Sequence, residues 1–175
     1  GKLTMSFPYT AGQIPVYYNC LNTGRPVVKG VFNHYTSRYL DIPNEPLYPF
    51  GYGLSYSNFE YSNLSISKKV VSKNDEIEVT VQIKNNSQYD GMEVVQLYIE
   101  AQSFSVSRPN LELKDFTKVF IKANETKQIK FVLPVAKLSY YNIDMKDIVE
   151  QGLYNIYVGP SSINLLKDVI EYKEK

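Results

Sequence analysis

The nine residues from 76 to 84, EIEVTVQIK, alternate strictly between apolar and polar side chains. Successive side chains of a β-strand point to opposite faces of the sheet, so Ile77, Val79, Val81 and Ile83 share one face. Such a strand buries its apolar face and leaves the other face in water. The segment therefore predicts a sheet with a second apolar layer packed against it.

Other segments downstream of residue 58 carry strand signals and are separated by turn residues. The expected strands are residues 61–71, 76–84, 92–100, 117–122, 126–133, 152–159 and 164–172. Residues 117–122 and 126–133 are expected to form a hairpin around residues 123–125, and the spacing in 164–172 would also fit a short helix. Short strands at this spacing predict an all-β fold, an immunoglobulin- or fibronectin type III-like antiparallel β-sandwich.

The apolar residues of these strands predict which side chains face the core. The expected inward residues of the first and fifth strands are Leu64, Ile66 and Val70, and Ile129, Phe131 and Leu133. Residues 92–100, MEVVQLYIE, are apolar on both faces and predict a more fully buried strand.

Residues 1–58 have a different texture, because prolines and glycines interrupt them repeatedly from Pro8 to Gly53. This punctuation excludes a long helix and leaves room for short strands and turns only. An irregular stretch of this length is unusual inside a compact domain. We expect an irregular Tyr/Pro/Gly-rich segment that lies over another surface and uses its aromatic rings as anchors.

Composition excludes several classes of function. The 175 residues are 43% hydrophobic and 21% charged with a net charge of +1, which is typical of a soluble globular protein and gives no reason to expect nucleic acid or membrane partners. The single cysteine, Cys20, is expected to be a small, partly buried apolar residue. With one histidine, His34, it makes neither a metal site nor a nucleophile–base pair, so we expect no metal and no cofactor.

The first residues, GKLTMSFP, lack the basic and apolar regions of a signal peptide. This favours the cytoplasm over secretion only slightly and leaves the compartment open. The Asn-X-Ser/Thr sequences at Asn63, Asn85 and Asn124 would accept glycans only in a eukaryotic secretory pathway.

The candidate site lies in the irregular segment. Asp41 and Glu45 do not predict a catalytic pair, because a short Pro-containing loop gives no burial to raise the pKa of a general acid. Asp41 is better interpreted as an ion pair with Arg38 or a turn cap. The rings of Tyr35, Tyr39, Tyr48, Phe50, Tyr52 and Tyr56 either stack on sugars or, as we favour, anchor the segment against its neighbours. The candidate residues for a domain contact or a sugar-site rim are Arg38, Tyr39, Asp41, Tyr48, Phe50 and Tyr52. A domain contact is a further hypothesis for Arg108-Pro109.

Several phrases of the sequence together resemble the C-terminal part of glycoside hydrolase family 3 enzymes, the β-glucosidase/β-xylosidase group. Residues 1–19, GKLTMSFPYTAGQIPVYYN, are similar to the end of that family's α/β sandwich domain. The phrases NTGRP, YTSRYLD and PNEPLYPFGYGLSY resemble the connector that follows, and SRPNLELK resembles the fibronectin type III-like domain. The resemblance implies three parts: residues 1–20 as the tail of the α/β sandwich, 21–58 as a connector, and 59–175 as the fibronectin type III-like domain.

The resemblance also implies what the chain lacks. Family members hydrolyse β-glucosides or β-xylosides with retention, using an aspartate nucleophile on a barrel domain and a glutamate acid/base in the α/β sandwich. Both precede the part that this chain resembles, so no catalytic residue is carried over and the chain alone is expected to be inactive. Its expected role is a non-catalytic structural module that packs in cis on the barrel and α/β sandwich domains, with homo-oligomer formation an open alternative.

Two other classes of function stay open at this stage. The first is a self-sufficient carbohydrate-binding or adhesion module that uses the tyrosine-rich surface. The second, a small hydrolase in its own right, is disfavoured because the residues of the family's catalytic motifs are missing.

Overall fold

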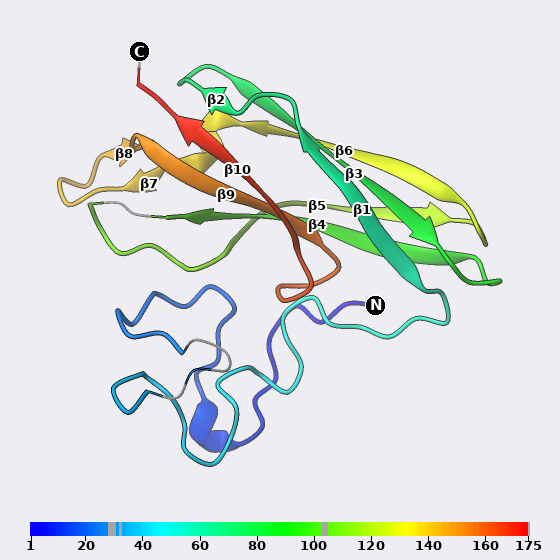
Figure 1. The fold of residues 1–175 in the computed structure, drawn as a ribbon, viewed down its shortest axis with the longest axis horizontal. Coiled ribbons are helices and arrows are strands. Elements are labelled where there is room, and N and C mark those ends of the chain that lie inside the picture. Colours follow the sequence, from blue (N-terminus) through cyan, green and yellow to red (C-terminus); the bar gives the residue numbers. More distant parts are fainter. Residues whose placement is uncertain (28–30, 32, 103–104, 175) are drawn as a thin grey trace.

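The computed structural model describes residues 1–27, 31, 33–102 and 105–174, and in them the chain is almost entirely β-structure and irregular segments (Figure 1). One sheet has the strand order β1-β3-β6 and the other β2-β10-β9-β4-β5, with a small β7-β8 hairpin at one end. The strands are β1 (Phe59–Ile66), β2 (Val70–Val71), β3 (Glu76–Asn85), β4 (Gly91–Ala101), β5 (Glu112–Ile121), β6 (Thr126–Pro134), β7 (Tyr140–Tyr141), β8 (Asp147–Ile148), β9 (Gly152–Gly159) and β10 (Leu166–Tyr172). Two short 3₁₀ helices are η1 (Ala11–Gln13) and η2 (Val135–Leu138). The predicted all-β sandwich is confirmed.

The alternating segment forms the central strand of the smaller sheet. β3 pairs antiparallel with β1 on one side and β6 on the other. Its apolar residues Ile77, Val79, Val81 and Ile83 are buried, as the pattern predicted. They face the larger sheet, because that is the apolar layer against which an amphipathic strand must pack.

The core lies between the two sheets and is built mainly from β3, β4, β6 and β9. β4 is buried along most of its length, and the inward residues Ile129, Phe131 and Leu133 of β6 are buried too. Both predictions are confirmed. Burying each large aliphatic side chain contributes about 1.5–3 kcal/mol, so this one core accounts for the stability of the sandwich without a disulfide.

The predicted hairpin between residues 117–122 and 126–133 is wrong. β5 pairs with β4 in the larger sheet and β6 pairs with β3 in the smaller one, so the intervening turn crosses from one sheet to the other. The turn itself has Asn124 at a positive φ of 60° and a hydrogen bond from Glu125 N to Lys122 O of 3.1 Å. A hairpin and a crossover between sheets have similar turn residues and strand patterns, so the sequence did not separate them.

The predicted first strand, residues 61–71, is two strands in different sheets. β1 ends at Ile66 in the smaller sheet, and β2 pairs in parallel with β10 in the larger one. The change of sheet alters which side chains face inward: Val70, expected inside, is 55% exposed, whereas Val71 is 2% exposed. Leu64 and Ile66 pack in or against the core as expected.

The last two predicted strands are confirmed. Residues 152–159 form β9, and the ambiguous segment at the end of the chain forms β10, which pairs antiparallel with β9. Among the described residues no helix has the length and apolar character needed to cross a membrane.

The described residues of 1–58 lie along the outer face of the larger sheet, next to β4 and β5, as an irregular segment (Figure 1). In their described part, the regular structure consists of η1 and the isolated bridges Phe7–Tyr48 and Leu21–Pro109. The predicted irregular character is therefore confirmed. The second bridge joins this segment to the loop before β5.

Several tyrosines are buried, and their hydroxyl groups titrate late. Burial raises the pKa of Tyr154 to about 12, and its hydroxyl donates a 2.7 Å hydrogen bond to Glu150 O. Burial is also the largest cause that raises the pKa of Tyr61, Tyr98 and Tyr157. The folded chain therefore holds these protons more tightly than the unfolded chain, in which tyrosine titrates near pH 10.

The free energy of unfolding should fall in alkaline solution for this reason. A tyrosine whose pKa is higher in the folded chain than in the unfolded chain contributes its full share to the free energy of unfolding below about pH 10. That contribution is lost as the pH rises through about 12. Urea unfolding at a series of pH values measures this slope. Tyr154→Phe should reduce the slope between about pH 10 and about pH 12. Equal slopes in the wild type and Tyr154→Phe would contradict the assignment.

Candidate domain-docking surface

The first residues of the chain are bonded to residues about 45 positions later, across the irregular segment. Phe7 N donates to Tyr48 O at 2.8 Å, and Tyr48 N donates to Phe7 O at 3.3 Å. Four residues before Phe7, Leu3 N donates to Tyr52 O at 2.8 Å. The rings of Tyr48 and Phe7 form an edge-to-face pair with their centroids 6.4 Å apart. The centroids of the Tyr48 and Tyr52 rings are 4.9 Å apart. The predicted residues Tyr48 and Tyr52 are thus anchored within the chain's own irregular segment.

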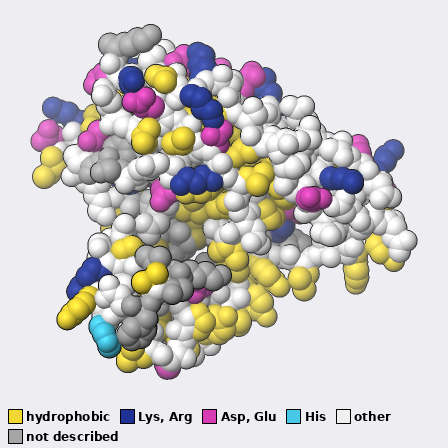
Figure 2. Space-filling model, in the orientation of Figure 1, with side chains coloured by type: hydrophobic (Ala, Val, Ile, Leu, Met, Phe, Trp, Pro, Cys, Tyr) yellow, Lys and Arg dark blue, Asp and Glu magenta, His cyan; other side chains and the backbone are white. Residues whose placement is uncertain are grey.

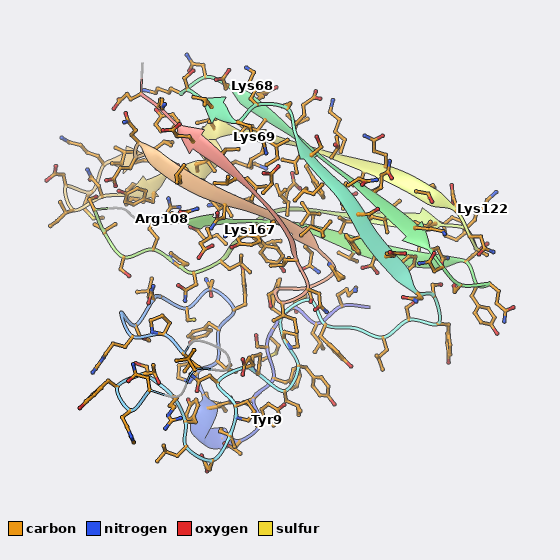
Figure 3. The ribbon with its side chains drawn as sticks, viewed as in Figure 1. Tyr9, Lys68, Lys69, Arg108, Lys122 and Lys167 are labelled. Atoms are coloured by element: carbon orange, nitrogen blue, oxygen red, sulfur yellow. The ribbon has the colours of Figure 1, made fainter. Side chains whose placement is uncertain are left out.

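Gln13 holds two further parts of the segment together. Its side chain is buried, accepts a hydrogen bond from Tyr9 N at 2.7 Å, and donates to Pro43 O at 2.9 Å and Glu45 O at 3.1 Å. Tyr9 lies beside η1, away from the sandwich (Figure 3). Sequence reasoning did not single out Gln13. The signal available was its place in the Gly-Gln-Ile-Pro phrase, which carries no chemistry that predicts a structural bond.

Tyr18 connects the irregular segment to the outer face of the larger sheet. Its ring stacks on Phe50 with a centroid separation of 4.3 Å and meets Tyr98 of β4 edge-on at 5.9 Å. Leu113 N donates to the Tyr18 hydroxyl at 3.4 Å. Phe50, one of the predicted contact residues, is therefore held inside the chain between the segment and the sandwich.

Gly51 lies at a close contact between the segment and the sandwich. It has a positive φ of 82°, and a Cβ there would lie 2.6 Å from Gln96 Oε1 and 2.9 Å from Ser161 Cα. Next to it, Ser162 N donates to Phe50 O at 3.0 Å. Glycine fits because it has no Cβ and adopts positive φ without strain.

A buried carboxylate links the start of the chain to both sheets. Glu93 on β4 is buried, and its Oε1 accepts hydrogen bonds from Lys2 Nζ at 3.2 Å and from the Tyr61 hydroxyl of β1 at 2.9 Å. Burial, followed by the charge and hydrogen bond of Glu93, raises the pKa of Tyr61. A buried charge needs such partners, so Lys2 both neutralises Glu93 and fixes the segment to the sandwich.

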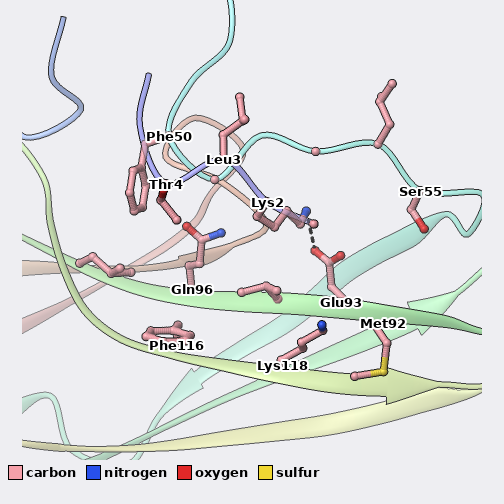
Figure 4. Close-up of a pocket in the computed structure, with 16 residues that line it drawn as sticks. Lys2, Leu3, Thr4, Phe50, Ser55, Met92, Glu93, Gln96, Phe116 and Lys118 are labelled. Carbon is pink, nitrogen blue, oxygen red and sulfur yellow. Dashed lines mark hydrogen bonds and ion pairs between the residues drawn. The ribbon is translucent and has the colours of Figure 1, made fainter. Parts of the chain in front are cut away.

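A groove of about 370 Å³ runs between the segment and the outer face of β4 and β5 (Figure 4). Its lining is mainly apolar, with Leu3 and Phe50 on one side and Met92 and Phe116 on the other. A second hollow of about 340 Å³ lies within residues 4–19 and shares Thr4 and Phe50 with the first. The two hollows therefore adjoin each other at Thr4 and Phe50.

Large apolar side chains of the segment face solvent. We call the following set the docking surface: Met5, Phe7, Tyr9, Ile14, Tyr17, Leu21, Tyr35, Tyr39, Leu40, Leu47, Tyr48, Leu54 and Tyr56. Hydrophobic side chains gather over this segment and in the hollow between it and the sandwich (Figure 2). A concentration of exposed apolar side chains on one segment is typical of a site that another protein surface covers.

The six predicted contact residues fall into two groups. Tyr48, Phe50 and Tyr52 contact residues 3–18 as described above, although Tyr48 is also partly open to solvent. The other three are exposed in the loop around residues 33–44. There, Tyr39 N donates to Asn44 Oδ1 at 2.9 Å, and Asn44 Nδ2 donates to Ser37 O at 2.8 Å. The roles of all six in a domain contact or a sugar-site rim stay predictions, as does the Arg38–Asp41 ion pair or cap.

Asp41 and Glu45 do not form a catalytic pair of carboxylates. Asp41 and Glu45 are both exposed, so neither has the buried setting that a general acid requires. No cluster of His, Cys, Asp and Glu among the described residues could hold a metal ion.

Two sequence interpretations need correction. Cys20 was expected to be partly buried, but it is exposed, because the segment around it runs along the surface; its Sγ accepts a long 3.6 Å hydrogen bond from Asn110 Nδ2. The sequon at Asn85 cannot accept a glycan in the folded chain. The Asn85 side chain is fully buried and donates to Tyr89 O at 2.7 Å.

Arg108, for which a domain contact was a hypothesis, acts inside the sandwich instead (Figure 3). Its side chain is 4% exposed, with Nη1 donating to Leu138 O at 3.1 Å and Nη2 to Glu112 Oε1 at 2.8 Å. The guanidinium also lies over the Tyr140 ring, 4.7 Å from the centroid. It therefore joins the loop before β5 to η2 and β7.

Comparison with known proteins shows what the chain is similar to. Residues 93–162 match the family described as "Fibronectin type III-like domain". The chain is 40% identical over 171 residues to the periplasmic β-glucosidase of Salmonella typhimurium, covering 98% of this chain and 22% of that protein. It is 38% identical over 162 residues to a β-xylosidase of Formosa agariphila, covering 93% of this chain and 21% of that protein.

The solved structure of a β-glucosidase from Listeria innocua has the same fold over the whole of this chain. The TM-score is 0.93 with 47% sequence identity, covering 100% of this chain and 24% of that one. The chain thus spans about a fifth to a quarter of the length of the relatives it matches. The resemblance drawn from the sequence is confirmed: over nearly its whole length this chain is similar to the C-terminal, fibronectin type III-like part of the β-glucosidases and β-xylosidases of glycoside hydrolase family 3.

Proposed function

We propose that this chain is a non-catalytic module of a family 3 β-glycosidase that hydrolyses β-glucosides or β-xylosides with retention in carbohydrate metabolism. Its role is to pack in cis against the barrel and α/β sandwich domains and to stabilise them. The observation that carries the proposal is the docking surface. A sandwich with a complete core of its own holds an irregular segment whose large apolar side chains face outward.

The way in which the segment is held supports this role. Lys2, Tyr18 and Gly51 each join it to the sandwich through buried or close contacts. A surface fixed in this way is preorganised, so a partner that covers it loses little conformational freedom of the segment on binding. The apolar side chains then supply the stabilising free energy by leaving water.

The proposed division of the chain follows the resemblance: residues 1–20 from the α/β sandwich, 21–58 as connector, and 59–175 as the fibronectin type III-like domain. The backbone bonds between Phe7 and Tyr48 and between Leu3 and Tyr52 support a connector that folds back on the first part. The docking surface then lies where the barrel, the α/β sandwich and the fibronectin type III-like domain meet.

Two assays test the proposed function. The chain alone should not hydrolyse aryl β-glucosides or aryl β-xylosides above the buffer rate. A hybrid in which this chain replaces the matching quarter of the Listeria innocua β-glucosidase should hydrolyse the aryl β-glucoside, because the two share the same fold over this part, with a TM-score of 0.93. Turnover by the chain alone that one carboxylate substitution abolishes would overturn the proposal, as would a folded hybrid without activity.

A further inference from the structure

The groove between the segment and the larger sheet has one wall made by two neighbouring strands. β5 is the edge strand of that sheet, and its pairing with β4 sets Met92 beside Phe120, Val94 beside Lys118, and Gln96 beside Phe116. Phe116 is 63% exposed, and Met92 and Phe120 are exposed as well. Large exposed rings on an edge strand are a liability unless something covers them.

Lys118 is a positively charged side chain among these apolar residues of β4 and β5. Lys118 lies between Phe116 and Phe120 along β5 and lines the groove (Figure 4). It forms no ion pair with any residue in the part of the chain that the structure describes. The other lysine of the groove, Lys2, is already paired with Glu93. Lys114, also on β5, pairs with Glu112, and Lys137 of η2 pairs with Asp115 of β5.

The groove thus offers apolar walls and the positive charge of Lys118, which no carboxylate of the described residues pairs with. A complementary occupant carries apolar or aromatic side chains next to a carboxylate, because opposite charge fixes the register and apolar contact supplies affinity. A volume of about 370 Å³ accommodates a few side chains rather than a whole element.

We infer that this groove receives a segment of the enzyme's own catalytic region, with apolar side chains that flank an Asp or Glu paired to Lys118. The inference rests on the proposed function and specifies the contact by which the module is docked. The relatives that the chain matches have about four times its length, so most of the polypeptide that could supply the segment lies outside the chain.

A second copy of the chain fits the groove less well. In a twofold contact the same patch meets itself, so Lys118 would face the lining of an identical groove. The acid in that lining is Glu93, which is buried and held by Lys2 and Tyr61. A twofold pairing would therefore bring two lysines together without a free carboxylate.

Photo-cross-linking in the hybrid enzyme identifies the occupant directly. With p-benzoylphenylalanine in place of Phe116, the expected product is a cross-link within one polypeptide, to a peptide of the catalytic region that contains Asp or Glu. A cross-link between two polypeptides, a peptide without an acid, or no cross-link in the folded hybrid would each overturn the inference. The product is read by mass spectrometry and does not depend on activity, so failure here is distinct from failure of the proposed function.

Charge reversal gives an independent measurement. Lys118→Glu should shorten the half-life of the hybrid at elevated temperature about fivefold or more, because a repulsive pair replaces an attractive one. The matched control is Lys84→Glu, an exposed lysine of β3 in the other sheet, which should leave the half-life unchanged. In the isolated chain both variants should unfold at the same temperature as the wild type. Equal half-lives for the two hybrid variants would count against the Lys118 pair.

Discussion

Replacing Arg108 by alanine is expected to lower the free energy of unfolding by about 3 kcal/mol. Its guanidinium is buried and donates hydrogen bonds to Leu138 O and Glu112 Oε1. Alanine leaves that carbonyl without its charged donor and removes the cation from the face of Tyr140. Glu112 keeps its second partner, Lys114 Nζ at 2.8 Å, which places the expected loss at the lower end for a broken buried pair.

The measurement is urea unfolding of the isolated chain, with Arg25→Ala as control. Arg25 lies exposed in the irregular segment, so its removal should change the free energy of unfolding by less than about 0.5 kcal/mol. Arg108→Lys should recover only a small part of the loss, because an ammonium group cannot reproduce two divergent donors and a planar stack. Wild-type stability in Arg108→Ala would show that the buried contacts contribute nothing.

The sheets were predictable where one physical rule decided the outcome. Burial on one face alone explains the alternation of Ile77 to Ile83, so the pattern predicts both the strand and its inward side chains. Pairing partners were not predictable in the same way. Residues 117–133 have the turn and the strands of a hairpin, but β5 and β6 bond to β4 and β3, contacts that depend on distant parts of the chain.

The candidate site shows the same division between local and distant causes. The aromatic residues Tyr48, Phe50 and Tyr52 stood out from composition, and they do lie at contacts of the irregular segment. Gln13 and Glu93 were missed, because a buried polar residue is recognised by its partners and these lie far away in sequence. For Glu93 the sequence did hold a signal, because alternate residues of a strand share a face and Glu93 therefore lies on the same inward face of β4 as Val95 and Leu97. A charged side chain at such a position requires a partner.

The irregular segment owes its conformation to specific bonds rather than to periodicity. Backbone pairs near Phe7 and Leu3, the buried amide of Gln13 and the ring of Tyr18 each fix a short stretch. Without repeating structure, each contact carries a larger share of the order of the segment than a single bond in a sheet does. Substitution at one close contact should therefore release a stretch of chain, and Gly51 is the sharpest case.

Gly51→Ala is expected to weaken the attachment of the segment to the sandwich by about 3 kcal/mol. Two causes add: a left-handed backbone at φ 82° disfavours any side chain, and the new Cβ would lie 2.9 Å from Ser161 Cα, a backbone atom that cannot rotate away. The amide of Ser162, which donates to Phe50 O, should then exchange its hydrogen on the order of a hundred times faster.

Gly24→Ala separates these two causes. Gly24 has nearly the same positive φ, 77°, but a Cβ there would meet nothing within 4 Å, so this variant carries the backbone strain without the collision. It should cost only about 1 kcal/mol and leave the exchange of Ser162 unchanged. Equal effects of the two variants on Ser162 would mean that close contact with the sandwich does not hold the segment. A selective effect of Gly51→Ala would show that the sandwich fixes the docking surface in place.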